Sequence, residues 1–120
     1  MNEAKRILLV STDSDMGAAR ALVLRDAGYH VVATTGRAEA ERALAEGEFD
    51  VFVVCHTVGS GDTLALADAF RRINRHGQVV AVVAGLFLAI RADRVVQTLD
   101  GPHALLAAVD SLFRDSPPTP

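Results

Sequence analysis

Five short apolar runs, rich in Val, Ile and Leu, alternate along the chain with longer segments of helical spacing. The runs predict strands at 6–10, 30–34, 51–55, 79–83 and 94–99. Strands that alternate with helices form a parallel sheet covered by helices on both faces. The near-continuous apolar character of the runs fits such a sheet, because its strands are buried on both faces. The sequence therefore predicts an α/β domain.

The segments between these runs carry apolar residues at the spacing of a helix face. We expect helices at 15–27, at 37–46, from Asp62 or Thr63 to Asn74, and at 100–113, with Gly28 and Gly47 as stops. Residues 86–90 stand where a shortened fourth helix would lie. The predicted buried faces are Met16, Ala19, Leu22, Val23 and Ala27; Ala40, Ala43 and Leu44; Leu66, Ala67, Phe70 and Ile73; and Leu105, Ala108, Val109 and Leu112. The whole pattern predicts a flavodoxin-like (βα)5 fold, with a five-stranded parallel sheet between helices.

Length and composition indicate one globular domain, expected over residues 1–114, with "DSPPTP" at 115–120 as a tail or the start of a linker. Apolar residues make up 50% of the chain and charged residues 22%. A net charge of -3, with arginines interspersed among acids, argues against direct nucleic-acid binding. No apolar run reaches the roughly 18 residues of a membrane span. We expect a cytoplasmic protein, and the single Cys55 excludes an internal disulfide.

Ligands of this fold class bind at the carboxyl ends of the strands, near the point where the strand order reverses. Three polar or glycine-containing loops are predicted at that edge. They are "STDSD" at 11–15, "CHTVGSGD" at 55–62 and "AGLF" at 84–87. Any binding or catalytic site is therefore expected among these loops.

Several stretches also match a known family in register. "RILLV" is followed by a polar, acidic loop and later by "LRDAGYHVVATTGRAEAERALAEGEFDVFVV", and the chain closes with "ADRVVQTLDGPHALLAAV". Over residues 5–113 the chain resembles the receiver domain of two-component response regulators. The resemblance implies the (βα)5 fold and a phosphorylation site at the carboxyl ends of the strands.

Receivers phosphorylate an aspartate at the end of the third strand and hold magnesium with an acidic pair after the first. By this resemblance, Cys55 stands at the aspartate position, and Ser11 and Thr12 stand at the acidic pair, followed by Asp13. The family's hydroxyl, aromatic switch and lysine positions correspond to Ala84, Val95 and Thr98. Each change removes charge or hydrogen bonding that phosphoryl transfer requires.

The resemblance thus indicates a pseudo-receiver that is not an enzyme, holds no metal or cofactor, and binds a protein partner or a second copy in bacterial signalling. The candidate interface is Leu86, Phe87, Leu88 and Ile90, within the apolar "LFLAI". The alternative is a sensor that binds a small molecule or anion at the strand ends, through Ser11, Thr12, Asp13, His56 and Thr98.

Cys55 and His56 leave three reactive alternatives open. A cysteine-dependent phosphatase would need an arginine six positions after the cysteine, but that residue is Gly61. Without a cationic neighbour, a thiol keeps a pKa too high to attack readily. Redox sensing would need an accessible thiol, and a metal site would need further ligands beside Cys55 and His56. The simplest interpretation of Cys55 is a small apolar residue at a buried strand end.

Overall fold

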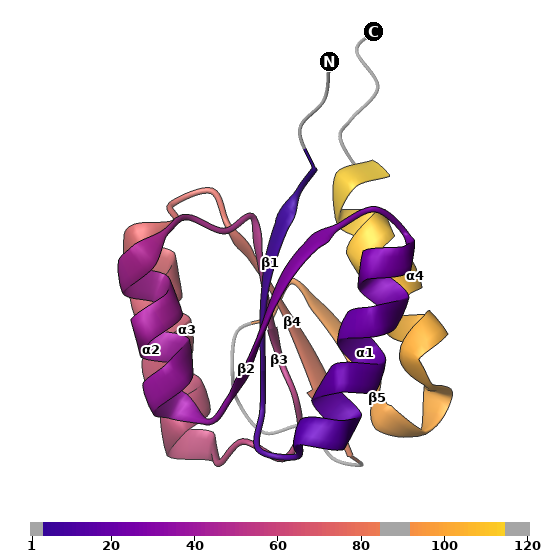
Figure 1. Cartoon of the computed structure of the whole chain (residues 1–120), viewed down its shortest axis with the longest axis horizontal. Coiled ribbons are helices and arrows are strands. Elements are labelled where there is room, and N and C mark those ends of the chain that lie inside the picture. The colour runs from indigo at the N-terminus through magenta and orange to yellow at the C-terminus, as the bar shows by residue number, and fades with distance from the viewer. Residues whose placement is uncertain (1–3, 85–91, 115–120) are drawn as a thin grey trace, which may run out of the picture.

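The computed structural model describes residues 4–84 and 92–114, apart from the side chain of Arg114. One parallel sheet contains β1 (Arg6–Ser11), β2 (His30–Thr35), β3 (Val51–Val54), β4 (Gln78–Val83) and β5 (Arg94–Gln97), in the order β2-β1-β3-β4-β5 (Figure 1). The predicted five-stranded parallel sheet is confirmed. Since the strand order reverses between β1 and β3, the carboxyl ends of these two strands are where this fold class places its ligands.

Four α-helices are described: α1 (Ser14–Asp26), α2 (Arg37–Glu46), α3 (Ser60–Ile73) and α4 (Pro102–Arg114). Figure 1 shows α1 and α4 on one face of the sheet and α2 and α3 on the other. The predicted shortened fourth helix, the candidate interface of Leu86, Phe87, Leu88 and Ile90, and the expected tail at 115–120 all lie outside the described residues. None of the described helices is both long enough and apolar enough to span a bilayer.

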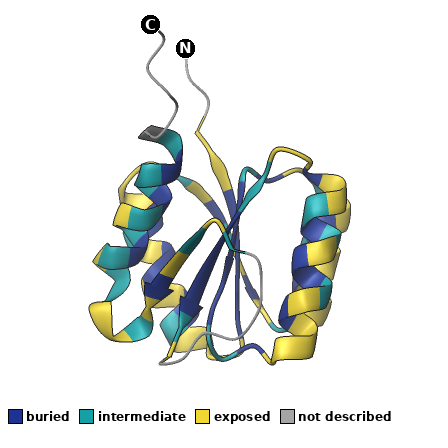
Figure 2. Ribbon diagram, turned by 180° about the vertical axis from the view of Figure 1, so that it is seen from behind, coloured by how far each residue is buried: buried dark blue, intermediate teal, exposed yellow. Residues whose placement is uncertain are grey.

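Successive residues of the strands point to opposite faces of the sheet, so the protein has two hydrophobic cores. Ile7 and Leu9 pack under α1 and α4, whereas Leu8 and Val10 pack under α2 and α3. All four side chains are fully buried. In Figure 2 the buried residues are concentrated in the sheet and on the helix faces that cover it, while the outer faces of the helices are exposed. The predicted inward residues Leu44, Leu66, Phe70 and Leu105 are buried as expected.

The predicted buried face of α1 is wrong. The residues that are buried are Gly17, Arg20, Ala21 and Leu24, and Leu22 is 59% exposed. Small and apolar residues are spread around this helix, so two stripes were compatible with the spacing. The stripe containing Gly17 is the buried one, since a residue without a side chain lets the helix lie against the end of β1. A Cβ on Gly17 would be only 3.3 Å from Cβ of Ser11.

Other boundaries and faces also differ from expectation. The third helix begins at Ser60 after Gly59, not at Asp62 or Thr63, and Ile73 at its end is 46% exposed. The third strand ends one residue before Cys55. The fifth strand ends at Gln97, because Thr98–Asp100 form the short 3-10 helix η1, which closes at Gly101 with φ of 85°. A positive φ is available to glycine at little cost, so Gly101 sets this turn.

Candidate functional site

The carboxyl edge of the sheet brings together residues from four segments of the chain. Ser11 ends β1, Cys55 follows β3, and Thr98 follows β5, while Arg20 reaches the same edge from α1. The side chains of Ser11 and Arg20 both interact with the Cys55 thiol, and Arg20 also binds Thr98. We call Ser11, Arg20, Cys55 and Thr98 the strand-end cluster. Three of these four residues were predicted as site positions, and Arg20 was not.

Hydroxyl groups form hydrogen bonds between the two loops beside this cluster. Thr57 Oγ1 accepts a hydrogen bond from the Thr12 N–H at 2.9 Å and lies 3.2 Å from Ser11 Oγ. Thr12 Oγ1 in turn donates to the Thr57 carbonyl oxygen at 3.0 Å. These bonds join the loop after β1 to the loop after β3. Receivers carry an acidic pair at the first of these loops, whereas here the two positions make a neutral network within the protein.

Asp13 is the acidic residue that directly follows the two positions of the receiver acidic pair. The structure gives it another role, because its Oδ1 accepts a hydrogen bond from the Met16 N–H at 3.1 Å and so caps the N-terminus of α1. An aspartate at this position accepts a hydrogen bond from a backbone N–H that has no partner within the helix. Its negative charge also interacts favourably with the positive end of the helix dipole. Asp13 is exposed, and the neighbouring Ser11 Oγ donates to its carbonyl oxygen. Its carboxylate therefore stabilises the N-terminus of α1.

Arg20 is the feature of this edge that sequence reasoning missed. The residue is only 6% exposed, and its Nη2 donates to Thr98 Oγ1 at 2.7 Å. Its buried Nη1 has no hydrogen-bond partner in the part of the chain that the structure describes. Arginine is rarely buried without a paired carboxylate, so nothing in the residue type alone indicated this position. The one available signal was its helical spacing of three from Gly17.

Cys55 is a buried thiol, 2% exposed. Burial raises its pKa, because the thiolate would lose its hydration, and this outweighs the charge and hydrogen bonding of Arg20 and the hydrogen bonding of Ser11, which act to lower it. The expectation that no cation lies beside Cys55 is wrong, since Arg20 does. The thiol is nevertheless protonated at neutral pH and shielded, which disfavours the phosphatase and redox alternatives.

The remaining predicted positions make no described hydrogen bond to this cluster. Ala84 is exposed and follows Val83, the last residue of β4, so neither offers a hydroxyl at this point of the edge. Val95 is 46% exposed on β5. His56 is partly buried, and its Nδ1 has no described hydrogen-bond partner. The structure therefore unites Ser11, Cys55 and Thr98 but leaves Ala84 and Val95 outside the cluster.

Receivers hold magnesium at the carboxyl ends of the strands, so we compared the residues at this edge with the requirements of that ion. It prefers hard oxygen ligands in an octahedron, usually with one or two carboxylates. The strand-end cluster offers two hydroxyls, a thiol and a guanidinium, and the nearby Asp13 carboxylate caps a helix. No group of three or more His, Cys, Asp or Glu side chains that could hold a metal occurs within residues 4–84 and 92–114. The residues present do not fit a magnesium ion.

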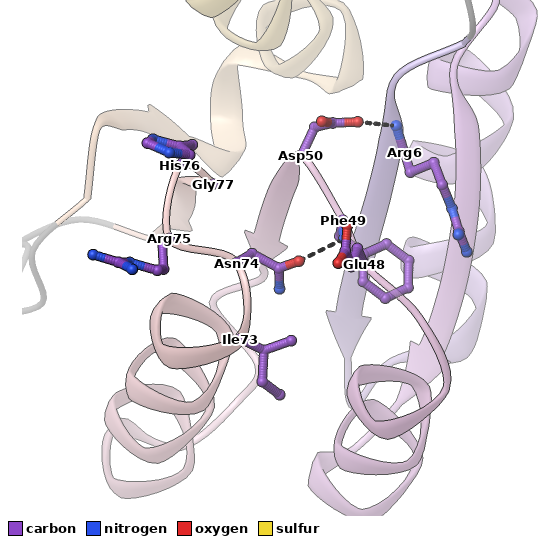
Figure 3. Close-up of a pocket in the computed structure, with 9 residues that line it drawn as sticks. All are labelled: Arg6, Glu48, Phe49, Asp50, Ile73, Asn74, Arg75, His76 and Gly77. Carbon is purple, nitrogen blue, oxygen red and sulfur yellow. Dashed lines mark hydrogen bonds between the residues drawn. The ribbon is translucent and has the colours of Figure 1, made fainter.

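A hollow lies at the opposite, amino-terminal edge of the sheet, with a volume of about 470 Å³. Its main polar groups already hold the fold together: Asp50 Oδ2 accepts from the Arg6 N–H, and buried Asn74 Oδ1 accepts from the Phe49 N–H, both at 2.8 Å. Figure 3 shows Arg75 and His76 extending away from the Arg6 side chain, on the other side of the pocket. Because these charged groups do not converge, we assign this hollow no ligand. Its lining residues are Arg6, Glu48, Phe49, Asp50, Ile73, Asn74, Arg75, His76 and Gly77.

Comparison with solved structures identifies the architecture. The receiver protein of Sinorhizobium medicae superposes with a TM-score of 0.81 at 23% identity, covering 94% of this chain and 97% of that one. The fold is that of a response regulator receiver domain. The CheY-like receiver of Methanospirillum hungatei gives a TM-score of 0.80 at 16% identity over 94% and 96% of the two chains. The chemotaxis regulator CheY4 of Vibrio cholerae gives 0.80 at 17% over 92% and 99%.

No protein-family model and no curated protein sequence matches the chain. The likeness to receivers therefore lies in the fold, at low sequence identity. The receiver-like architecture that the sequence predicted is confirmed. What the strand-end cluster does within it has to be argued from its own chemistry.

Proposed function

We propose that the chain is a receiver-like domain that works without phosphorylation, as a protein interaction module in a signalling pathway. The observation that carries this proposal is the chemistry at the end of β3. Cys55 takes the place of an acceptor carboxylate, and its thiol is buried, with a pKa raised by that burial. A protonated thiol is a poor nucleophile toward a phosphoryl donor.

The surroundings of Cys55 support the same conclusion. Phosphoryl transfer depends on a metal ion and fixed donors that neutralise the phosphoryl oxygens. Ser11 and Thr12 offer no carboxylate to a metal, and their hydroxyls are engaged with Thr57 and Asp13. Arg20, the cation described at this edge, is buried against Thr98. A domain of this kind has kept the receiver fold and exchanged the groups that the reaction requires.

Exposed apolar residues at the edge strand support a role in protein binding. Leu99 in η1 is 96% exposed, and Val95 on β5 is 46% exposed. β5 is an edge strand of the sheet. A contiguous patch of apolar side chains in contact with water often marks an interface, and these two residues are candidates for such a patch. The interface predicted at Leu86, Phe87, Leu88 and Ile90 precedes this strand in the sequence and remains a prediction.

Incubation with acetyl phosphate and magnesium tests the proposal. We expect the intact mass of the protein to stay unchanged, because Cys55 is protonated and the described residues around it form no metal site. A receiver that carries an acceptor aspartate, treated in parallel, serves as the positive control. A stoichiometric phosphoryl adduct on this chain, lost on Cys55→Ala, would contradict the proposal.

A second candidate function is the sensing of a small anion at the same edge of the sheet. The specific observation that favours it is the unpartnered Nη1 of Arg20, a buried positive group among neutral side chains. Neither candidate requires an enzymatic step. The two are compatible, since a ligand held at the strand ends could change the surface that a partner protein binds.

A further inference from the structure

The charge of Arg20 has no counter-charge in the described structure. A guanidinium keeps its charge in proteins, and a buried charge is costly unless it is paired and hydrogen-bonded. Arg20 is 6% exposed, its polar contacts among the described residues are with the neutral Thr98 hydroxyl and the Cys55 thiol, and it forms no ion pair with a described carboxylate. The segment 85–91, "GLFLAIR", contains no acidic residue. A negative group from outside the chain would compensate this charge.

The neighbours of Arg20 favour a small anion in particular. Thr98 brings a hydroxyl whose oxygen accepts from Arg20 and whose hydrogen can donate to an oxyanion, and the Cys55 thiol is neutral. Charged donors bind oxyanions through short, strong hydrogen bonds, and two nitrogens of one guanidinium can act together. Nη1 is buried, so the ligand must be small enough to reach it.

We propose that the strand-end cluster binds a small oxyanion, such as inorganic phosphate, without covalent attachment, and that Nη1 of Arg20 is its charged donor. The inference deepens the second candidate function and rests on it, and it is independent of the protein-binding role. The Thr12–Thr57 bonds join the two loops beside the cluster, so we expect an anion held there to change the amide signals of both loops.

The test is a titration with inorganic phosphate, free of magnesium and at constant ionic strength, followed by amide NMR. We expect saturable shifts at Ser11, Thr12, Cys55 and Thr98. Arg20→Met should weaken phosphate binding by about tenfold or more, because it removes a charge-assisted hydrogen bond. Arg42→Met, which removes one exposed positive charge from α2, should leave binding unchanged and is the matched control.

Arg20→Lys provides a second variant that keeps the charge, should Arg20→Met fail to fold. We expect Arg20→Lys to bind phosphate more weakly than the wild type, because it cannot donate from two fixed nitrogens. The absence of saturable shifts, equal binding by both Arg20 variants and the wild type, or shifts confined to residues away from the cluster would overturn the inference. Because no phosphoryl donor is present, failure here leaves the acetyl phosphate result unaffected, and the reverse is also true.

Discussion

Replacing Cys55 with aspartate is expected to leave the domain folded, although it puts a carboxylate at a site that is 2% exposed. Arg20 already lies beside this position and would supply the counter-charge. Combining Cys55→Asp with Arg20→Met should remove that compensation and destabilise the fold strongly. Loss of one partner of a buried ion pair costs about 3–5 kcal/mol. We therefore expect a coupling energy of that order between the two substitutions.

Urea denaturation of the wild type, both single variants and the double variant measures this coupling. Cys55→Asn is the matched control, since it has nearly the shape of aspartate but no charge. Its combination with Arg20→Met should be close to additive. Each set of wild type, two single variants and double variant forms a double-mutant cycle. If the cycles with Cys55→Asp and with Cys55→Asn gave the same coupling energy, the charge of Arg20 would not act at position 55, and our account of the strand-end cluster would be wrong.

Gly77→Ala is expected to destabilise the domain by about 1–3 kcal/mol, the typical cost of forcing extra atoms into a packed core. A Cβ on Gly77 would be 2.4 Å from Cζ and 2.7 Å from Cε2 of Phe70. The Phe70 ring is fully buried and stacks on Phe52 with centroids 5.5 Å apart. The ring cannot move without disturbing the core under α2 and α3, so the added methyl group creates strain.

Gly61→Ala, in the first turn of α3, is the control for this substitution. No heavy atom lies within 4 Å of its added Cβ, and alanine favours a helix over glycine by up to about 1 kcal/mol. We expect Gly61→Ala to leave stability unchanged or to raise it slightly. Thermal and urea denaturation of both variants compares them directly. Equal stability of Gly77→Ala and the wild type would show that the contact with Phe70 is not tight.

The sheet could be predicted from the sequence because each strand is a short apolar run. Residues 7–10 alternate between the two cores and are all apolar, so the apolar run alone was enough to predict the strand. Helix faces were harder to predict where the helix is rich in small residues. In α1, periodicity allowed two stripes, and only the close approach of Gly17 to Ser11 decides between them. In α3, Phe70 was placed correctly but Ile73 was not, because the helix ends there and its last side chain meets water.

The candidate site was predicted only in part, for a similar reason. Ser11, Cys55 and Thr98 could be placed at one edge, because strands of a parallel sheet end together. Arg20 could not, since a charged residue in a helix is normally expected on the exposed side. Thr57 was also missed, because its role depends on the distance between two loops that are far apart in sequence. Both residues change the chemistry of the edge, and both come from tertiary packing.

The central claim is that the described strand ends form a neutral cluster around a buried guanidinium and not a magnesium site. Amide NMR during a magnesium titration, at constant ionic strength, tests it most directly. We predict no saturable shift at Thr12, Asp13, Cys55 or Thr57, because Asp13 caps α1 and the hydroxyls bind one another. Concerted, saturable shifts of Asp13 and Cys55 at millimolar magnesium would show that a metal site persists, and would contradict the account.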